Sequence, residues 1–475
     1  MSYDLSAAIN SILGPLNDFL YGYILIFLLV AAGIYFTIRT RFVQFRLVPD
    51  ALRCLKEKAQ ETGDGTKKVS SFQALMISTA SRVGTGNIAG ISTALVAGGP
   101  GAVFWMWVMA IVGGASAFVE STLAQIYKVK DGKEYRGGPS YYIQQAMGKR
   151  WLGVLFSVLL ILCFAYGFNG LQSYNMSSAL DHYIPGYANT IWPAVVGAIL
   201  AIATAWIIFG GVHRISFITS FVVPVMAVIY ILLGLGITLM NISQLPAVLA
   251  LIVREAFDVQ SIIGGFMGSA VVIGIKRGLF SNEAGMGSAP NAAATATVSH
   301  PVKQGMVQVI SVFIDTLIIC STTAMMLLIT GVQGEAGVLD GIPYVQACVS
   351  SQVGEWGIHI ITFSIFAFAF SSLIGNYYYT ESNLLFIKNN RTLLNVFRVT
   401  CLLAIFLGAQ ADFSTVWNLA DVLMGFMAIV NICSIFVLGG IAVRALEDYE
   451  RQRDMGIDPT FRAADIGLDN TSEWK

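Results

Sequence analysis

Apolar runs of about 20 residues recur along the whole chain, and no other feature of the sequence restricts its fold as strongly. A helix of about 20 residues crosses the roughly 30 Å hydrocarbon core of a bilayer. Of the 475 residues, 56% are hydrophobic and only 12% are charged. Soluble proteins average roughly 25% charged residues. The sequence therefore predicts an all-α integral membrane protein with no room for a soluble domain.

The apolar periodicity predicts about 11 transmembrane helices. They cover residues 17–38, 73–97, 102–127, 151–180, 190–210, 215–240, 262–299, 305–330, 356–387, 392–411 and 413–443. We expect three parts: residues 1–72 hold a periplasmic N-terminus, an extra helix and a cytoplasmic loop, residues 73–443 form a ten-helix core, and residues 444–475 form a solvated cytoplasmic tail. The N-terminal segment lacks a basic n-region and a small-residue cleavage site, so we expect the first helix to remain in the mature chain.

Basic residues indicate the orientation of these helices. They gather in the loops 39–68 and 128–150 and in the tail from Arg444, whereas the loops assigned to the other side contain only Arg254. Short cytoplasmic loops carry the excess of Lys and Arg. We therefore expect the N-terminus outside and the C-terminus in the cytoplasm.

Polar, glycine-rich sequence interrupts two of the predicted helices. One break is SRVGTGNIAG at residues 81–90, and the other is FSNEAGMGSAP at residues 280–290. Residues 262–299 would extend about 57 Å as one uninterrupted helix, nearly twice the hydrocarbon thickness. Irregular backbone at membrane depth is tolerated where it is buried in protein or lines a cavity. With the first helix set aside, the breaks occupy the first and sixth of ten helices, a pattern typical of inverted-repeat secondary transporters. A packing kink is the alternative for either break alone.

Four motifs resemble the alanine or glycine:cation symporter family: AGGPGAVFWMWV at 97–108, SRVGTGNIAG, RGGPSYYI at 136–143 and LFSNEAGMGSAPNAAA at 279–294. The likeness runs from about residue 42 to residue 448. It implies a LeuT-type 5+5 inverted repeat of the amino acid-polyamine-organocation superfamily, with one extra N-terminal helix and discontinuous first and sixth core helices. It also implies residence in the cell inner membrane and import of alanine or glycine with Na⁺ by alternating access, with no cofactor beyond that ion. Serine or D-alanine as the substrate and H⁺ as the coupling ion stay open.

The same resemblance implies that the first break holds the substrate carboxylate. The N–H groups of Thr85 and Gly86 and the side-chain amide of Asn87 would donate to it. A glycine at this position lets the backbone approach the ligand closely. Phe168 and Gln172, in the third core helix, would line the same site.

The second break would complete the substrate site. Backbone carbonyls near Phe280 and Ser281 would accept from the ammonium group, and Gly285 and Met286 would crowd the substrate side chain. A pocket wall formed by such residues leaves little volume, so it admits glycine or alanine and rejects longer side chains. An apolar pocket discriminates poorly against one extra hydroxyl, which leaves serine open.

A Na⁺ site is implied between the first and eighth core helices. Its ligands would be the carbonyls of Ala80 and Val83 and the hydroxyls of Ser371 and Ser372. Hydroxyl and carbonyl oxygens suit a hard monovalent cation. Helix packing or bonding to its own helix is the alternative role of the serine pair.

Charged residues within the apolar segments should pair with one another or face water. Arg82 and Glu283 adjoin the two breaks and are expected to meet across an inner gate, while Asp315 is either a structural partner of an arginine or a proton-linked group. Glu120 is expected near the cytoplasmic end of its helix, where snorkelling or capping would explain it. The other charged residues in these segments are Lys276, Arg277, Glu381 and Asp421. Lys276 and Arg277 do not agree with the cytoplasmic placement of basic residues. They would lie in the outer half of the second broken helix or line the outer vestibule.

Other classes of function lack support in the sequence. A channel needs a continuous pore with a carbonyl or charged ring, and an intramembrane enzyme needs a base beside a nucleophile such as Ser288, which has no paired His or Lys. The six cysteines lie mostly in apolar runs without metal-ligand spacing, and the four histidines are scattered. The net charge of zero gives no sign of nucleic-acid binding, and the sequence leaves the oligomeric state open while being compatible with a monomer.

Overall fold

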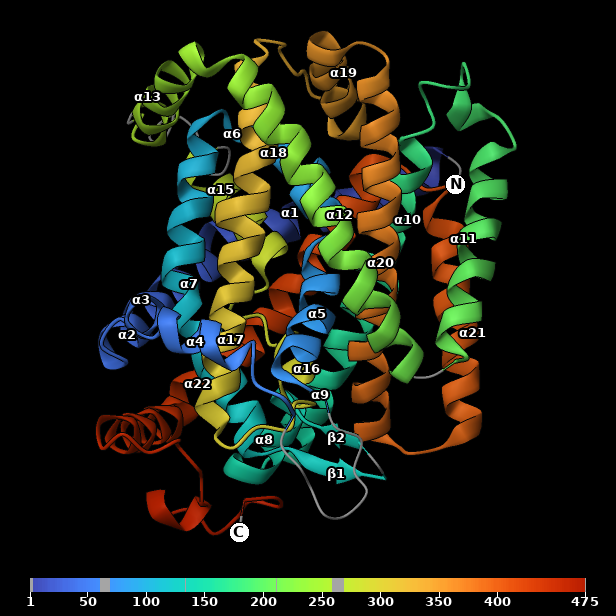
Figure 1. Ribbon diagram of the computed structural model, residues 1–475. Coiled ribbons are helices and arrows are strands. Elements are labelled where there is room, and N and C mark those ends of the chain that lie inside the picture. Colours follow the sequence, from blue (N-terminus) through green and yellow to red (C-terminus); the bar gives the residue numbers. More distant parts are fainter. Residues whose placement is uncertain (1–2, 60–68, 133, 211, 259–268, 475) are drawn as a thin grey trace.

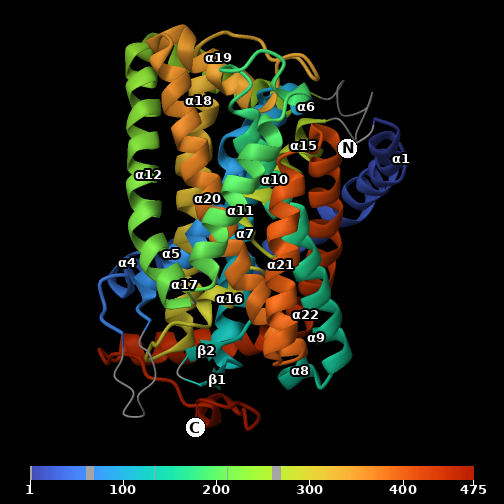
Figure 2. The ribbon, with the colours of Figure 1, turned by 90° about the vertical axis from the view of Figure 1, so that its right-hand side faces the viewer.

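The computed structural model describes residues 3–59, 69–132, 134–210, 212–258 and 269–474. These residues form a bundle of helices (Figures 1 and 2). One end of the bundle carries the C-terminus and the hairpin of β1 (Val129–Asp131) and β2 (Glu134–Arg136), and the other carries α13 and α19 (Figure 1). We name these ends the C-terminal face and the opposite face. Three stretches of the sequence analysis lie outside the described residues: residues 60–68 of the first basic loop, Lys133, and residues 262–268 of the seventh predicted helix.

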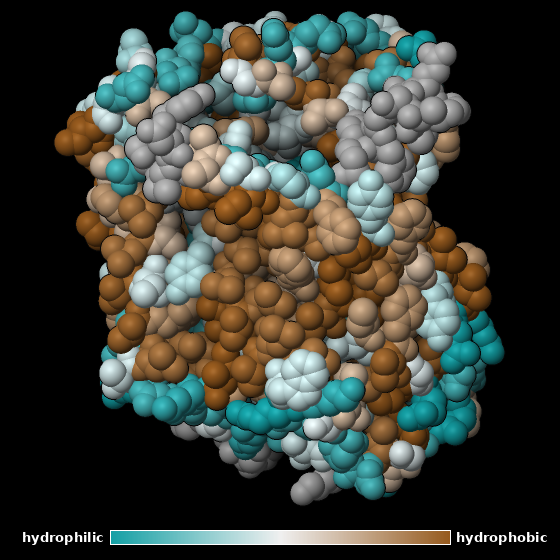
Figure 3. Space-filling model, turned by 180° about the vertical axis from the view of Figure 1, so that it is seen from behind, coloured by the Kyte–Doolittle hydropathy of each residue, from teal (hydrophilic) through white to brown (hydrophobic). Residues whose placement is uncertain are grey.

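A broad hydrophobic band separates two hydrophilic ends of the molecule (Figure 3). Among the described residues, eight helices are long and apolar enough to cross a membrane: Ser6–Arg39, Gly101–Ile126, Arg150–Ser178, Phe221–Met240, Pro301–Ile329, Trp356–Ile387, Arg391–Gly408 and Phe413–Asp454. Shorter apolar helices span Ala89–Gly98 and Trp192–Ile208. The protein is therefore embedded in a membrane, as predicted.

Several of the long helices are assembled from consecutive elements. The N-terminal helix joins α1 (Tyr3–Phe19), η1 (Leu20–Leu25) and α2 (Ile26–Arg39), and it lies along the outside of the bundle against α22 (Phe413–Asp454) (Figure 2). Two other long helices contain a π-helical segment. One joins α9 (Arg150–Ile161), η3 (Leu162–Phe168) and α10 (Asn169–Ser178), and the other joins α17 (Pro301–Phe313), η7 (Ile314–Cys320) and α18 (Ser321–Ile329).

The remaining elements complete the core and its connections. In chain order they are α3 (Val43–Arg46), α4 (Val48–Cys54), α5 (Ser71–Arg82), η2 (Thr85–Asn87), α6 (Ala89–Gly98), α7 (Gly101–Ile126), α8 (Pro139–Met147), η4 (Tyr187–Asn189), α11 (Trp192–Ile208), α12 (Val212–Met240), η5 (Ile242–Gln244), α13 (Leu245–Ala256), α15 (Ala270–Asn282), α16 (Pro290–Ala293), α19 (Gly341–Val353), α20 (Trp356–Ile387), α21 (Arg391–Gly408) and η8 (Ala463–Ile466). Helix α7 packs against both α15 and α17, and α20 packs against α5.

Both helices with internal glycine-rich sequence are broken where the sequence indicates. A capping box between Ser70 and Gln73 starts α5, which ends at Arg82, and α6 resumes at Ala89. Helix α15 ends at Asn282 because Glu283 adopts a left-handed conformation with φ 55°, and Gly285 and Gly287 also have positive φ. Only glycine adopts such angles at no steric cost, so the sequence GMG allows the chain to turn here.

The C-terminal tail is largely exposed, and parts of it pack against the C-terminal face. Helix α22 continues to Asp454 rather than ending at 443, and the residues after it fold back onto the C-terminal face. There Trp474 donates its indole N–H to the Gln125 carbonyl at 2.7 Å and stacks edge-on against Phe461. The Lys128 ammonium lies 4.8 Å above the Trp474 ring. A half-buried tryptophan whose N–H is satisfied anchors a segment well.

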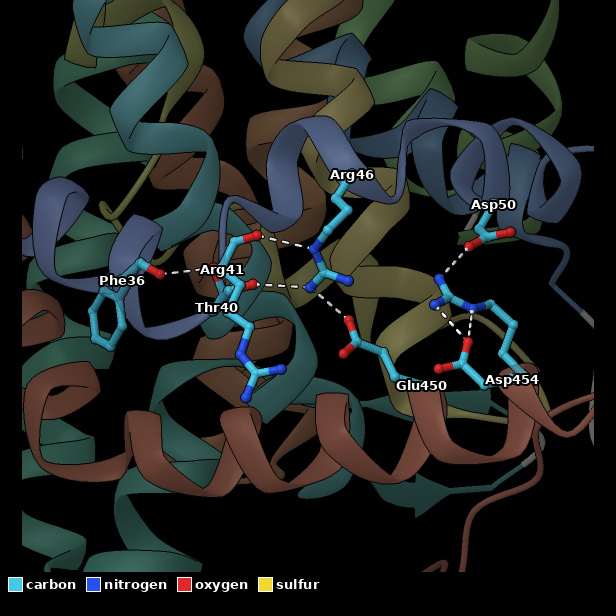
Figure 4. Close-up of polar contacts among 8 residues, drawn as sticks. Phe36, Thr40, Arg41, Arg46, Asp50, Glu450 and Asp454 are labelled. Atoms are coloured by element: carbon cyan, nitrogen blue, oxygen red, sulfur yellow. Dashed lines mark hydrogen bonds and ion pairs between the residues drawn. The ribbon is translucent and has the colours of Figure 1, made fainter.

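Ion pairs hold the end of α22 beneath α3 and α4 (Figure 4). Arg46 pairs with Glu450 at 2.6 Å, and Arg453 pairs with Asp50 at 3.1 Å. Nearby, burial lowers the pKa of His300 below the ordinary value of histidine. Its ring is therefore neutral at pH 7, so that Nδ1 can accept from the Val302 N–H at 3.2 Å and start α17.

Two amphipathic helices at the opposite face, α13 and α19, were not predicted from the sequence. Each has 12 or 13 residues, too short to cross a bilayer, and each lies in a stretch assigned to a loop. A search for apolar runs of membrane length passes over helices this short.

Candidate functional site

The first break forms a short buried turn at the centre of the bundle. The Gly84 N–H donates to Asn87 Oδ1 at 3.0 Å, which closes the turn, and the Thr85 N–H donates to Gln172 Oε1 at 3.0 Å. Gln172 thus lies beside the break, as expected from the sequence. Its amide oxygen accepts the N–H that was predicted to bind a carboxylate. A carboxylate oxygen is the same kind of acceptor and carries more charge.

Three backbone carbonyls converge on one hydroxyl where α5 ends. Ser372 Oγ lies 3.0 Å from the Ala80 carbonyl oxygen, 3.1 Å from that of Ser81 and 3.3 Å from that of Val83. One hydroxyl hydrogen serves only one acceptor at a time, so this group holds more oxygens than donors. An oxygen-rich group of this kind is suited to a hard monovalent cation.

Ser371 does not join the oxygen group formed by Ala80, Ser81, Val83 and Ser372. Its hydroxyl donates to the Phe368 carbonyl of its own helix at 2.8 Å. Neighbouring helical residues point about 100° apart, so only one of two adjacent serines can face α5. The expectation that both hydroxyls contribute is wrong for the arrangement seen here, whereas Ala80, Val83 and Ser372 are brought together.

Asp315 connects the two breaks. Its carboxylate accepts from the Asn87 side-chain amide at 2.7 Å, from the Ser281 hydroxyl at 2.7 Å and from the Thr316 hydroxyl at 2.9 Å. Asn87 comes from the first break, Ser281 from the end of α15, and Asp315 from the π-helical segment η7. All of these side chains are buried. Among the described residues no arginine forms an ion pair with Asp315, whose hydrogen-bond donors here are neutral side chains.

Aromatic rings cover the first break on one side. The Gly86 backbone is so close to the Phe280 ring that a Cβ at residue 86 would lie 2.8 Å from it. The Phe280 ring centroid is 4.8 Å from that of Phe168 and 5.1 Å from that of Trp417. We call Phe168, Phe280 and Trp417 the aromatic wall. Trp417 was not predicted, because nothing in its local sequence distinguishes it from a packing residue of α22.

Gly285 and Met286 lie away from the aromatic wall, contrary to the expected role in crowding the substrate. The nearest atoms to a Cβ at Gly285 would belong to Ser116, Ile432 and Leu29. The Gly285 N–H donates to Glu120 at 3.2 Å, and its carbonyl accepts from the Asn431 amide at 2.9 Å. The hydrogen bond from the Met286 N–H to the Glu283 carbonyl keeps Met286 in the same turn.

Glu120 stabilises the backbone of the second break through hydrogen bonds and does not snorkel toward the membrane surface. Its side chain is fully buried and accepts from both Gly285 and Asn431, the latter at 2.7 Å. Asn431 was not predicted from its local sequence. Its position on α22, three helical turns from Asp421, becomes meaningful only when α22 packs beside the break.

Arg82 and Glu283 do not form the expected ion pair. Arg82 donates to Gln308 Oε1 at 3.1 Å, whereas Glu283 accepts from the Ser81 and Ser288 hydroxyls at 2.9 and 2.6 Å. Both charges are buried next to the breaks. Ser81 therefore links the end of α5 to the second break, which the two charged residues were expected to do directly.

Lys276 and Arg277 belong to a buried ionic group. Asp421 on α22 lies 2.6 Å from Arg277 and 3.2 Å from Lys276, and Asn17 of the N-terminal helix donates to it at 3.4 Å. The Arg277 guanidinium also stacks 4.3 Å from the Trp417 ring. The group connects the N-terminal helix, α15 and α22. Through Arg277 it also packs against Trp417 of the aromatic wall. Buried charges of this kind must be paired to be tolerated.

These features define a class of protein. Two broken membrane helices meet at a buried polar centre, as in secondary transporters with discontinuous helices. The first carries the oxygen-rich carbonyl group, and the Asp315 carboxylate of η7 bridges the two. The fold agrees: the crystal structure of MhsT in complex with L-phenylalanine superposes with a TM-score of 0.56 at 15% sequence identity, covering 80% of this chain and 96% of that one. The predicted LeuT-type fold is confirmed.

Sequence comparison identifies the family within this class. The profile of the sodium:alanine symporter family matches residues 6–463. The amino-acid carrier protein AlsT of Bacillus subtilis (strain 168) is 48% identical over 467 residues, 98% of each chain. The probable sodium/glutamine symporter GlnT of the same organism is 48% identical over 453 residues, 95% of this chain and 93% of that one. The chain belongs to the sodium:alanine symporter family, and it is a symporter and not an enzyme.

Proposed function

We propose that the protein imports alanine or glycine together with Na⁺. The observation that carries this proposal is the convergence of the Ala80, Ser81 and Val83 carbonyls on Ser372, directly beside the turn at Gly84. A cation bound there would hold the end of α5 against α20. Because the same backbone continues into the substrate turn, cation binding and substrate binding would stabilise the same closed arrangement.

The size of the substrate side chain would be limited by the aromatic wall. The Phe280 ring already approaches the Gly86 backbone closely enough to leave no room for a methyl group on that residue. A substrate held by the Thr85 and Gly86 N–H groups and the Asn87 amide would have to place its side chain against the wall. Hydrogen or methyl fits such a position best, while serine and D-alanine are alternatives that an apolar wall discriminates weakly.

Substrate binding would require Gln172 to change its partner. A carboxylate at Thr85 would replace the Gln172 oxygen as acceptor, and the Gln172 amide could then donate to the same carboxylate. The carbonyls of Phe280 and Ser281 follow Leu279, whose carbonyl accepts from the Glu283 N–H at the last turn of α15. Carbonyls at a helix C-terminus carry a partial negative charge and would receive the ammonium group.

The distribution of basic residues indicates how the protein is oriented across the membrane. We infer that the C-terminal face is cytoplasmic, because the segments 39–58 and 128–150 and the end of α22 bring most Lys and Arg to it. The N-terminus then lies outside a cell inner membrane, residues 1–72 precede a ten-helix core at 73–443, and residues 444–475 are cytoplasmic. A monomer would contain every residue of the proposed sites, since all come from one chain.

Uptake by the purified protein in proteoliposomes tests the function. We expect labelled alanine and glycine to accumulate when an inward Na⁺ gradient is imposed, and not when K⁺ replaces Na⁺. Unlabelled glutamine should compete poorly, which matters because one relative carries the name of a glutamine symporter. Accumulation of glutamine in preference to alanine would refute the proposed substrate, and equal uptake with K⁺ would refute sodium coupling.

Ser372→Ala tests the cation group, and Ser371→Ala is its matched control. The Ser372 hydroxyl lies among three carbonyls, whereas that of Ser371 donates to the Phe368 carbonyl of its own helix and lies 3.8 Å from the Met226 sulfur. We expect Ser372→Ala to raise the Na⁺ concentration for half-maximal uptake about tenfold, equivalent to the loss of roughly 1.4 kcal/mol. Ser371→Ala should change it less than twofold. Equal effects of the two variants on Na⁺ dependence would contradict this assignment.

A further inference from the structure

Residues 455–474, which we call the C-terminal segment, cross the C-terminal face after α22 ends (Figure 1). The Trp474 indole N–H is bonded to the Gln125 carbonyl near the end of α7, and the Phe461 N–H donates to the Ser299 carbonyl at 3.0 Å, just before α17. Between these two anchors, the Ala463 N–H donates to the Trp474 carbonyl at 2.9 Å. The C-terminal segment therefore bridges the end of α7 and the start of α17.

The same segment covers the place where the two broken helices meet on their C-terminal side. Helix α5 leads from this face to the first break, and the chain after α16 returns to it from the second break. The Thr297 N–H donates to the Val69 carbonyl at 2.9 Å, which joins the two. Ala74 of α5 and Ala296 belong to one buried apolar cluster, and Trp474 packs against that cluster. Any path from the breaks to the C-terminal face is closed at this point.

An ion pair adds a second attachment. The Lys303 ammonium on α17 lies 2.9 Å from the Asp458 carboxylate of the C-terminal segment and 2.9 Å from that of Glu57, which follows α4. The Lys303 side chain is only 2% exposed, whereas the Asp458 side chain is 75% exposed. A pair with one partner in water adds little stability. Segments with few buried contacts open at a lower free energy than core helices. The C-terminal segment can therefore leave the face while the helices stay folded.

We propose that the C-terminal segment is a clamp on the cytoplasmic end of the transport path. While Trp474 and Asp458 are docked, α5 and the chain after the second break stay together. Release of the segment lets them separate, so that the substrate and Na⁺ leave on this side. The inference rests on the proposed function for the orientation and the direction of transport. Because the docked contacts exist only in the closed arrangement, weakening them shifts the population toward the arrangement that is open to the cytoplasm.

Cysteine labelling of the purified protein tests the clamp. Val298 is 7% exposed and lies in the apolar cluster against which Trp474 packs. In Val298→Cys, labelling of residue 298 by N-ethylmaleimide, read by peptide mass spectrometry, reports whether the segment is docked. We expect saturating Na⁺ to slow this labelling about fivefold, because an ion that favours the closed arrangement also favours docking. K⁺ at the same concentration is the control and should have no effect.

A second variant weakens the clamp without removing Trp474. Asp458→Asn, combined with Val298→Cys, loses the charge that pairs with Lys303. Labelling should become about threefold faster, and the Na⁺ concentration for half-maximal uptake should rise by a similar factor, because the coupling is reciprocal. Asp465→Asn is the matched control and should change neither value. Asp465 is an exposed acid of the same segment, without an ion pair in the part of the chain that the structure describes.

The outcomes separate this proposal from the proposed function. A labelling rate that does not change with Na⁺ would overturn the clamp even if Na⁺-driven uptake of alanine is intact. Faster labelling of Asp458→Asn with an unchanged Na⁺ dependence of uptake would mean that the segment only covers the surface, and the proposal would be wrong. Labelling that is slowed by Na⁺ in a protein that does not accumulate alanine would support the clamp and refute the proposed substrate.

Discussion

Gly84→Ala is expected to abolish Na⁺-driven alanine uptake, with a loss of at least about a hundredfold in kcat/KM, or roughly 2.7 kcal/mol. A Cβ at this position would lie 2.3 Å from Ser372 Oγ and 3.0 Å from both end atoms of the Gln172 amide. The side chains could yield only by rotating away. Ser372 would then leave the three carbonyls, and Gln172 would leave the Thr85 N–H. A single methyl group thus disturbs the cation group and the substrate turn together.

Gly440→Ala provides the matched control for this variant. Gly440 lies in α22, where a Cβ would meet no atom within 4 Å, and alanine favours a helix by about 1 kcal/mol over glycine. Uptake and thermal stability should be unchanged or slightly improved. The melting temperature of Gly84→Ala should also stay within a few degrees of the wild type, since overpacking at one buried site costs typically 1–3 kcal/mol. Retention of wild-type Na⁺ affinity by Gly84→Ala would refute the proposed geometry of the cation group.

Asp315→Ala is expected to have the second largest effect. The substitution removes the acceptor for the Asn87 amide and the Ser281 hydroxyl, which come from the two different breaks. Each buried donor left without a partner costs about 1–3 kcal/mol. We expect uptake to fall by at least about thirtyfold, because the two breaks are no longer held in register at the substrate site. Asp315→Asn should retain part of the activity, since one amide oxygen can still accept.

Thr316→Val is the control for Asp315. It removes only the neighbouring hydroxyl that donates to the same carboxylate and leaves both donors from the breaks paired. Uptake by Thr316→Val should remain within about threefold of the wild type. If Asp315 acts by positioning the two breaks, the KM for alanine should rise in Asp315→Asn. Normal KM values combined with loss of the pH dependence of uptake would instead identify Asp315 as the proton-linked group that its sequence context also allows.

The two breaks illustrate what local sequence can predict. Glycines and small polar residues within apolar runs cannot face lipid as irregular backbone, so their presence indicates a buried centre without any knowledge of packing. The carbonyls of Ala80 and Val83, by contrast, were chosen from the resemblance to the symporter family, and they lie at the end of the first half-helix. Family motifs then connected the breaks to symport, and the family is confirmed over residues 6–463. The substrate and the bound ion stay predictions.

The predictions from sequence were wrong where the role of a residue depends on how one helix is rotated relative to its neighbour. Ser371 and Ser372 are adjacent and chemically identical, and only the packing of α20 on α5 decides which hydroxyl faces the carbonyls. Arg82 and Glu283 were paired by their positions beside the breaks, but each finds a neutral partner instead. Two residues at equivalent positions of a sequence pattern need not point their side chains toward each other.

The sequence by itself determined the environment, the two discontinuous helices and the family, because hydrophobic length and backbone polarity are local properties that the bilayer constrains directly. The tertiary structure alone decided the partners. Trp417 on the aromatic wall, Asn431 at the second break and the docked Trp474 all contact residues more than a hundred positions away, as in the contact of Asn431 with Glu120. Such contacts depend on how whole helices pack, and no local pattern along the chain records that packing.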